Sequence, residues 1–218
     1  MGELYEKKER TYHEVLPDLE ERKEMAAYLG RWVWYLFWLV IPGLIAGLMN
    51  SSLVSSSTVR MAGDVLTICT GVVYGVILLV MGKKEGQYTF AGISYMVAMI
   101  VTVLGELIGE SVIAALLYLV VVSALTVYTE YKEFYGHSTV LGNYDFAFSE
   151  KWKNLWKWYL GCNVVIVGST FLLLVGSIVT LLAALLLLGG TIALLVASII
   201  KLVYLYRMAK LLRNFSGE

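Results

Sequence analysis

The sequence predicts an all-α integral membrane protein: a bundle of six transmembrane helices, arranged as three helical hairpins, with both termini in the cytoplasm. Hydrophobic residues make up 59% of the 218 residues, and charged residues only 16%. The apolar residues gather in runs of about 20 residues, the length that crosses a bilayer as a helix. A soluble domain of this size could not bury so much apolar surface.

The lysines and arginines predict the orientation. When the apolar runs are threaded through a bilayer in order, every Lys and Arg except Arg60 falls on one side. Basic segments are retained in the cytoplasm during insertion, so we expect this side to be cytoplasmic. We therefore expect a multi-pass protein of the cytoplasmic or plasma membrane. Because the basic residues follow the membrane boundary and form no basic domain, we expect no nucleic-acid partner.

The apolar runs place the six spans. Aromatic residues from Trp32 to Trp38 begin the first span at the level of the headgroups, and Pro42 should kink it. The predicted spans are residues 32–49, 65–81, 88–104, 112–128, 156–175 and 178–200.

The division between the last two spans is the least defined. Residues 158–200 carry no charge, and as one helix they would be about 65 Å long, twice a bilayer. The chain must therefore fold back once. A turn at Gly176-Ser177 leaves two spans of adequate length, and Gly189-Gly190 is the alternative.

Three polar regions complete the predicted organisation. Residues 1–30 form an amphipathic segment, with Asp18 as a helix cap, and residues 207–218 form a basic tail. Residues 31–128 hold spans one to four, and residues 156–206 hold spans five and six. The connector between them, residues 129–155, is expected in the cytoplasm.

Two amphipathic helices are predicted to lie on the membrane surface, the first capped by Ser149. Each has an apolar stripe at helical spacing opposite basic residues. The stripes are Trp152, Leu155, Trp156 and Tyr159 in the first helix, and Leu202, Leu205, Ala209 and Leu212 in the second.

An acidic group is the first candidate site. Asp64, Glu106 and Glu110 flank outer connectors together with Arg60, and could form an outward mouth that attracts a cation. Alternatively, Asp64 complements a helix N-terminus and the glutamates face water. No ionisable residue is expected deep in the bilayer, because Lys201 lies at an inner span end and can snorkel.

Small and polar residues within the spans are further candidates. Gly43-xxx-Gly47 and Gly71-xxx-Gly75 let helix backbones approach closely, within the chain or between subunits. Asn163 is expected to bond a neighbouring helix or to hold a substrate.

Signs of catalysis are missing. His13 and His137 stand apart, and Cys69 and Cys162 are expected to be packing residues, so we predict no catalytic, cofactor or metal site.

Three functions stay open. The first is a noncatalytic interaction or assembly subunit, with a protein partner or a second copy of the chain beside the lipid bilayer. The second is a small-molecule transporter or substrate-capturing subunit. In size and orientation the chain is similar to the membrane substrate-binding subunits of energy-coupling-factor transporters, an analogy of fold that no motif carries. The third is an intramembrane enzyme.

Overall fold

The structure is a computed structural model that describes residues 19–50, 55–105, 112–173 and 177–217. These residues form α-helices joined by turns. The helices are α2 (Leu19–Met49), α3 (Ser57–Met81), α4 (Gly86–Gly105), α5 (Val112–Gly142), α6 (Phe146–Leu172) and α7 (Ser177–Ser216).

Five of these helices, α2, α3, α4, α5 and α7, are long and apolar enough to cross a membrane. α6 has 27 residues, but Lys157, Asn163 and several tryptophans make it more polar than the others. The predicted helical membrane bundle is therefore confirmed at the level of architecture. A sixth crossing, the grouping into three hairpins and the cytoplasmic termini stay predictions.

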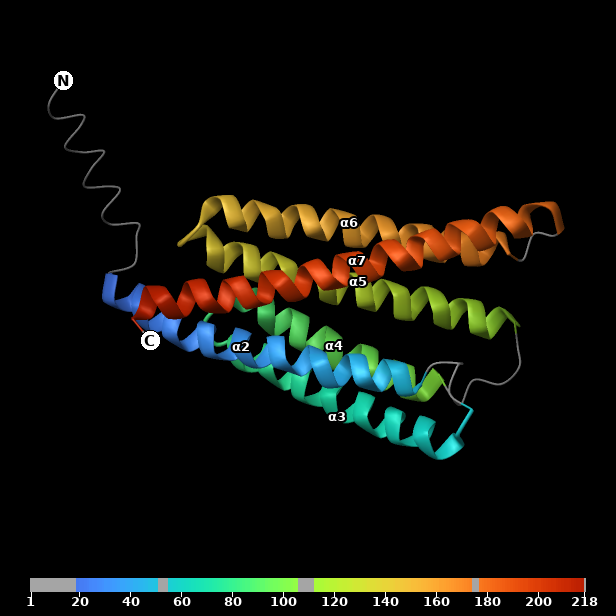
Figure 1. Ribbon diagram of the computed structural model, residues 1–218, viewed down its shortest axis with the longest axis horizontal. Helices are drawn as coiled ribbons and strands as arrows, with labels where there is room; N and C mark the ends of the chain where they lie inside the picture. Colours follow the sequence, from blue (N-terminus) through green and yellow to red (C-terminus); the bar gives the residue numbers. More distant parts are fainter. Residues whose placement is uncertain (1–18, 51–54, 106–111, 174–176, 218) are drawn as a thin grey trace, which may run out of the picture.

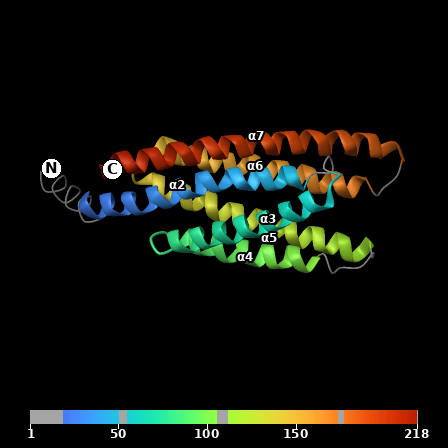
Figure 2. The same cartoon turned by 60° about the horizontal axis from the view of Figure 1, so that its bottom comes forward.

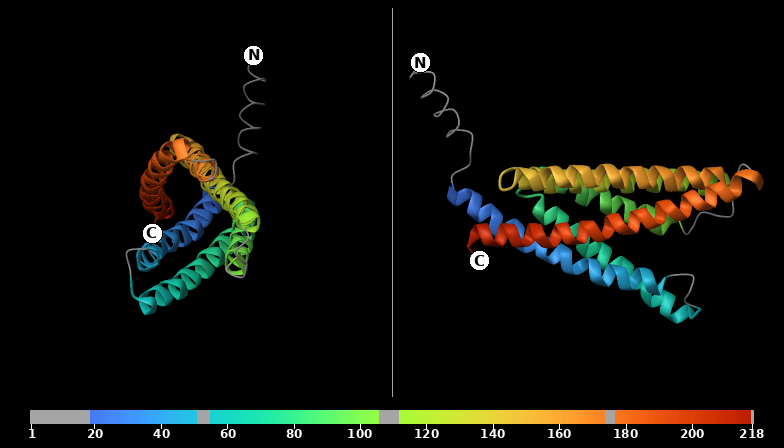
Figure 3. Two further views of the ribbon diagram at one scale, coloured as in Figure 1. Left: turned by 90° about the vertical axis from the view of Figure 1, so that its right-hand side faces the viewer. Right: turned by 45° about the horizontal axis from the view of Figure 1, so that its top comes forward.

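The helices form a closed ring. Each helix packs on its neighbours in the sequence, and α7 packs back on α2. The helices run along the length of the molecule (Figure 1), and a view down that length shows how they surround its axis (Figure 3, left). α2 begins and α7 ends at the same end as the α3–α4 and α5–α6 turns (Figures 1 and 2). We call this the proximal end, and the opposite end the distal end.

The helices reach further than the predicted spans. α5 continues through residues 129–142, which were predicted to begin a cytoplasmic connector. Its 31 residues make a helix about 46 Å long, longer than the roughly 30 Å apolar core of a bilayer. Residues 19–30 likewise form one helix with the first predicted span. Asp18, the predicted cap, lies outside the described residues.

The predicted cap at Ser149 is wrong. α6 begins at Phe146, and the side chain of Asp145 caps it by accepting from the Phe148 amide at 2.9 Å. Ser149 lies inside α6, where its hydroxyl donates to the Ser138 carbonyl of α5 at 2.7 Å.

The two predicted surface helices are instead continuous parts of α6 and α7. Trp152 and Leu155 are buried, as are Leu205, Ala209 and Leu212. Their apolar stripes join one core with residues of α2, α3, α4 and α5. An apolar stripe is covered equally well by a neighbouring helix as by lipid, so amphipathicity alone could not tell the two apart.

Gly189-Gly190 lies inside α7, which continues unbroken from Ser177 to Ser216, so the chain does not turn there. A Cβ atom on Gly190 would lie 3.0 Å from Ile166 of α6. The glycine thus permits close packing of the two helices. Gly176, the preferred turn, falls in the gap between α6 and α7, outside the described residues.

The core is concentrated in the proximal part of the ring. Every helix contributes to one cluster of buried apolar side chains there. Its largest fully buried members are Trp152, Tyr88, Phe134, Leu29, Leu36, Leu78, Met81, Leu141, Leu205, Met208 and Leu212. Towards the distal end, α2 and α3 diverge from α6 and α7 (Figure 3, right).

Arg22 links three segments at the proximal end. Its guanidinium donates to the Asn143 carbonyl in the α5–α6 turn and lies 5.4 Å from the ring centre of Phe215 in α7. The Tyr144 hydroxyl donates to the Arg22 carbonyl at 2.8 Å. Burial raises the pKa of Tyr144, and the nearby Arg22 charge opposes that rise. The start of α2 is thereby fixed to the turn and to the end of α7.

Candidate functional site

Lys201 of α7 is buried and binds two glutamates of α5. Its ammonium donates to Glu130 Oε2 at 2.9 Å and to Glu133 Oε2 at 3.1 Å. The Glu133 side chain is 1% exposed and that of Glu130 21%. All three residues lie inside helices that can span a membrane. The prediction that Lys201 snorkels is therefore wrong, because its ammonium is buried against the two glutamates. That no ionisable residue lies deep in the bilayer stays a prediction.

Glu133 is the centre of a wider polar network. Besides the lysine, its Oε1 atom accepts from the Tyr74 hydroxyl of α3 at 2.5 Å. The same oxygen lies 3.4 Å from His137 Nε2, one turn further along α5. His137 Nδ1 in turn lies 2.8 Å from the hydroxyl of Tyr88 in α4. Four helices are thus joined through one buried carboxylate.

The donors and acceptors assign the tautomer of His137. A carboxylate only accepts, so Nε2 must carry the proton that faces Glu133. Neutral imidazole then accepts from the Tyr88 hydroxyl at Nδ1. A hydroxyl, an imidazole and a carboxylate in this order resemble a hydrolase triad. Tyr88, however, is completely buried, and it lines neither the cavity beside Lys201 nor the hollow between α6 and α7.

The α5 sequence explains how the network assembles. Glu130, Glu133 and His137 follow one another at positions i, i+3 and i+7, which places them on one face of a helix. A Cβ atom on Gly136 would lie 2.9 Å from the Tyr88 ring. This glycine therefore makes the room through which Tyr88 reaches His137.

A cavity of about 280 Å³ lies beside the lysine, inside the ring. We call it the central cavity. Every helix contributes to its wall, which includes Gly43, Tyr74, Tyr95, Glu130, Tyr159 and Lys201. The Tyr159 hydroxyl lies 2.8 Å from Ser198 Oγ, which also lines the cavity. A largely apolar pocket with a few convergent polar groups is the usual form of a small-molecule site.

The charges beside the central cavity do not balance. With His137 neutral and both glutamates ionised, the two glutamates and the single lysine leave one net negative charge. Glu133 is enclosed by Lys201, Tyr74 and His137. Glu130 is the glutamate that lines the cavity, and Lys201 lines it too, so a ligand there meets the carboxylate of one and the ammonium of the other.

The described residues contain no group of three or more His, Cys, Asp or Glu that could hold a metal ion. In the network itself, the ammonium of Lys201 occupies the position between the carboxylates of Glu130 and Glu133. The predicted packing residues Cys69 and Cys162 are free thiols, exposed and buried respectively.

The predicted outer mouth is only partly described. Arg60 and Asp64 are exposed on α3, and Asp64 lies two turns inside the helix rather than in its first turn. Glu106 and Glu110 lie outside the described residues. The mouth stays a prediction.

Asn163 lies within α6, and its amide donates to the Tyr159 carbonyl of the same helix at 2.9 Å. The side-chain NH2 group of Asn163 therefore bonds its own helix, not a neighbouring helix as expected. Asn163 is not part of the central cavity wall.

The two glycine pairs are used differently. Cβ atoms on Gly71 and Gly75 would lie 2.6 and 2.9 Å from Met99 Sδ and Met96 Sδ of α4, so this pair packs two helices of the same chain. Gly43 and Gly47 are exposed, with no atom within 4 Å of a Cβ at either position.

No protein-family model, curated protein or solved structure matches this chain. The central cavity and the charged network beside it are the features of the molecule that indicate a function.

Proposed function

We propose that this protein binds a small molecule in the central cavity and takes part in its transport across the membrane. The observation that carries the proposal is a cavity walled by all six of the described helices, with a buried lysine–glutamate pair on its surface. Ionisable residues within spanning helices are costly, and they commonly mark substrate or ion pathways.

The chemistry of the wall indicates the class of ligand. The network beside the cavity has one more carboxylate than ammonium, and this surplus negative charge attracts a positively charged group. The rings of Tyr74, Tyr95 and Tyr159 line the same cavity, and aromatic faces bind organic cations. A volume of about 280 Å³ suits a ligand of a few non-hydrogen atoms up to the size of a small metabolite. A small organic amine fits these features best.

The test uses two glycines one turn apart on α2. Gly43 lines the central cavity and Gly47 does not, yet both have open space for a side chain. Gly43→Leu should fill the cavity without a steric clash, and Gly47→Leu is the matched control. The purified protein would be screened by thermal shift against organic amines, amino acids and carboxylates.

We expect at least one amine to raise the melting temperature of the wild type and of Gly47→Leu, but not of Gly43→Leu. Glu130→Gln should weaken binding of the same amine at least tenfold. If the two leucine variants respond identically to every probe, the cavity is not a binding site.

The predicted assembly role remains a second candidate because Gly43 and Gly47 are exposed and a Cβ atom at either position would touch no other part of the chain. If they form a subunit interface, the double variant Gly43→Leu/Gly47→Leu should reduce the particle mass in detergent. Gly168→Leu, at an exposed glycine of α6 with equal space, is the control. An unaltered mass would rule out this interface.

The enzyme alternative gains no support from two serines inside the helices, Ser94 and Ser198. Ser94 accepts from the Thr129 hydroxyl at 2.9 Å, and Ser198 pairs with the Tyr159 hydroxyl. Each also donates to a carbonyl of its own helix. Their bonding partners are hydroxyl and carbonyl groups rather than a base that could activate a nucleophile.

A further inference from the structure

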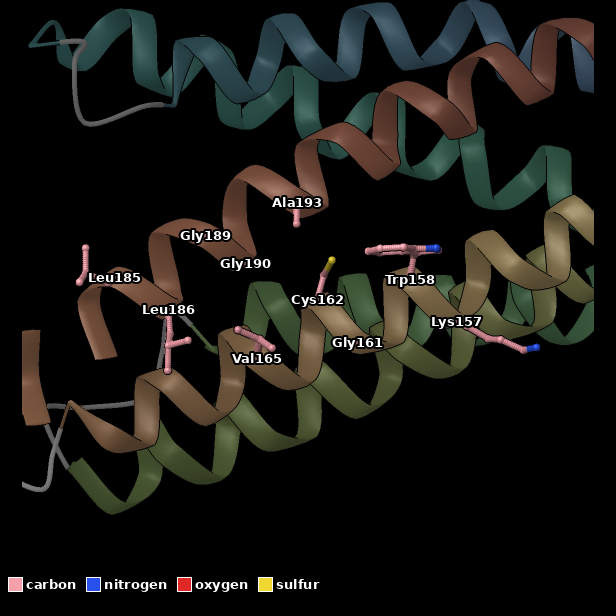
Figure 4. A pocket seen from close by; sticks show the side chains of 10 residues that line it. All are labelled: Lys157, Trp158, Gly161, Cys162, Val165, Leu185, Leu186, Gly189, Gly190 and Ala193. Carbon is pink, nitrogen blue, oxygen red and sulfur yellow. The ribbon is translucent and has the colours of Figure 1, made fainter. Parts of the chain in front are cut away.

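A second hollow, separate from the central cavity, lies between α6 and α7. It has a volume of about 520 Å³, and its wall includes Gly161, Cys162 and Val165 of α6 and Gly189 and Ala193 of α7. Figure 4 shows these residues along the gap between the two helices. We call this hollow the α6–α7 groove.

Missing side chains create the groove. A Cβ atom on Gly161 or Gly189 would have no neighbour within 4 Å. Gly190, by contrast, lies against Ile166 and Val165 and holds the helices together beside the groove. The groove is therefore open space next to a close helix contact.

The wall of the groove is suited to hydrocarbon. Leu185 and Leu186 complete an almost wholly apolar wall, and α7 is long and apolar enough to cross a membrane. In a bilayer, such a surface groove is in contact with lipid chains rather than water. The lining residues span about 12 Å along each helix, from Lys157 to Val165 and from Leu185 to Ala193.

One end of the groove carries a positive charge. Lys157 is exposed and is the charged residue of the lining. It lies about 22 Å along the helix from the distal end of α6 at Leu172, whereas Val165 lies about 10 Å from that end. A lipid chain in the groove would thus run from a phosphate at Lys157, on the proximal side, towards the distal end of α6.

Trp158 disfavours a transmembrane helix as the occupant. Its side chain is 70% exposed, and its ring projects from α6 towards α7 at the Lys157 end of the groove (Figure 4). A helix is about 10–12 Å across and rigid, so it would meet this ring. A flexible hydrocarbon chain can bend past it.

We propose that the α6–α7 groove binds one acyl chain of an anionic phospholipid, whose phosphate lies on Lys157. Anionic headgroups concentrate in the cytoplasmic leaflet, the side on which the sequence predicts the basic residues to lie. This lipid site is independent of the ligand in the central cavity.

The experiment is native mass spectrometry of the full chain in detergent, with equal amounts of phosphatidylglycerol and phosphatidylcholine carrying the same chains. We expect the wild type to retain phosphatidylglycerol about fivefold better, equivalent to about 1 kcal/mol for one lysine at an anionic surface. Lys157→Gln should remove this preference. Lys153→Gln, which affects an exposed lysine paired with Glu150, should keep it.

Filling the groove tests the chain site separately. Gly189→Leu should lower retention of both lipids at least fivefold, and Gly161→Leu should do the same from the opposite helix. Gly168→Leu, on α6 but outside the groove, should retain lipid as the wild type does. Circular dichroism would check that all three variants are folded.

Wild-type retention of both lipids by Gly189→Leu and Gly161→Leu would overturn the proposal. So would a preference for phosphatidylglycerol that survives Lys157→Gln. A fall in oligomer mass in the groove variants, with lipid retention unchanged, would mean that a second copy of the chain occupies the groove instead.

Discussion

The proximal and distal parts of the ring are built on different principles. The proximal part encloses tryptophan, tyrosine and phenylalanine side chains together with a lysine, two glutamates and a histidine. In the distal part of α7, residues 179–196, only Ala183 and Gly190 are buried. Leu181, Leu185 and Leu188 are each more than half exposed there. The proximal part resembles the interior of a soluble protein, and the distal part presents its apolar surface outwards, where a bilayer would cover it.

This difference shows that hydropathy and burial are separate quantities. The most hydrophobic stretch of the chain contributes little to the core, because lipid is as suitable a neighbour for leucine as another helix is. The polar stretch 129–142 contributes strongly, because its polar groups satisfy one another. Substitutions in the two parts should therefore have unequal effects on stability.

The largest effect should come from the buried lysine. Lys201→Met leaves Glu130 and Glu133 without their cation, and breaking a buried ion pair in this way costs about 3–5 kcal/mol. The measurement is reversible unfolding in mixed detergent micelles. Lys153→Met, at an exposed pair, should change stability by less than about 0.5 kcal/mol.

A double variant sharpens this prediction. Lys201→Met/Glu133→Gln removes one of the two stranded charges and should recover part of the lost stability, because the residues are directly coupled. A Lys201→Met protein as stable as Lys153→Met would show that the proximal network is not structural.

Two tryptophans of α6, six residues apart, compare a core position with a surface position. Trp152 is fully buried, with its ring 4.4 Å from His137 and 5.4 Å from Phe134, whereas Trp158 is 70% exposed. Trp152→Ala should cost about 3 kcal/mol through loss of packing. Trp158→Ala should cost less than about 0.5 kcal/mol. Equal losses in the same unfolding assay would contradict a proximal core.

A smaller effect is expected at the contact between α5 and α6. The single proton of the Ser149 hydroxyl goes to the Ser138 carbonyl, so Ser138 is the donor in the 2.8 Å bond between the two hydroxyls. Ser138→Ala should therefore destabilise the protein by about 1 kcal/mol. Thr191→Ala, which affects an exposed hydroxyl bonded to its own helix, should be nearly neutral. Hydrogen exchange at the α5–α6 turn would locate the loss, and unchanged exchange there would argue against it.

The sequence predicts the distal part well. Uninterrupted apolar runs give helices α3, α4 and the first half of α7 within a few residues of their observed limits, apart from the earlier start of α3 at Ser57. These runs are long and contain no competing polar pattern. A spanning length is sufficient to identify such helices.

Hydropathy could not predict the buried polar network of the proximal part, because a glutamate or lysine has the same hydropathy whether it is buried or solvated. Glu130, Lys132 and Glu133 resemble a cytoplasmic connector when counted one by one. The missed signal is their helical spacing, together with the absence of proline between Val112 and Gly142. Even that signal gives only a helix face. The partner, Lys201, lies 68 residues from Glu133 along the chain, and no local pattern relates them.

The contact between α2 and α7 has a consequence for how the protein is made. A Cβ atom on Gly30 would lie 3.1 Å from Leu212, so the first and last described helices are in direct contact. A ribosome adding 5–20 residues each second needs roughly 10–40 s to go from one to the other. Until then the face of α2 that packs on α7 stays uncovered, available to chaperones, lipids or a neighbouring nascent chain. Only when α7 has been synthesised can it cover this surface of α2 and exclude other binding partners from it.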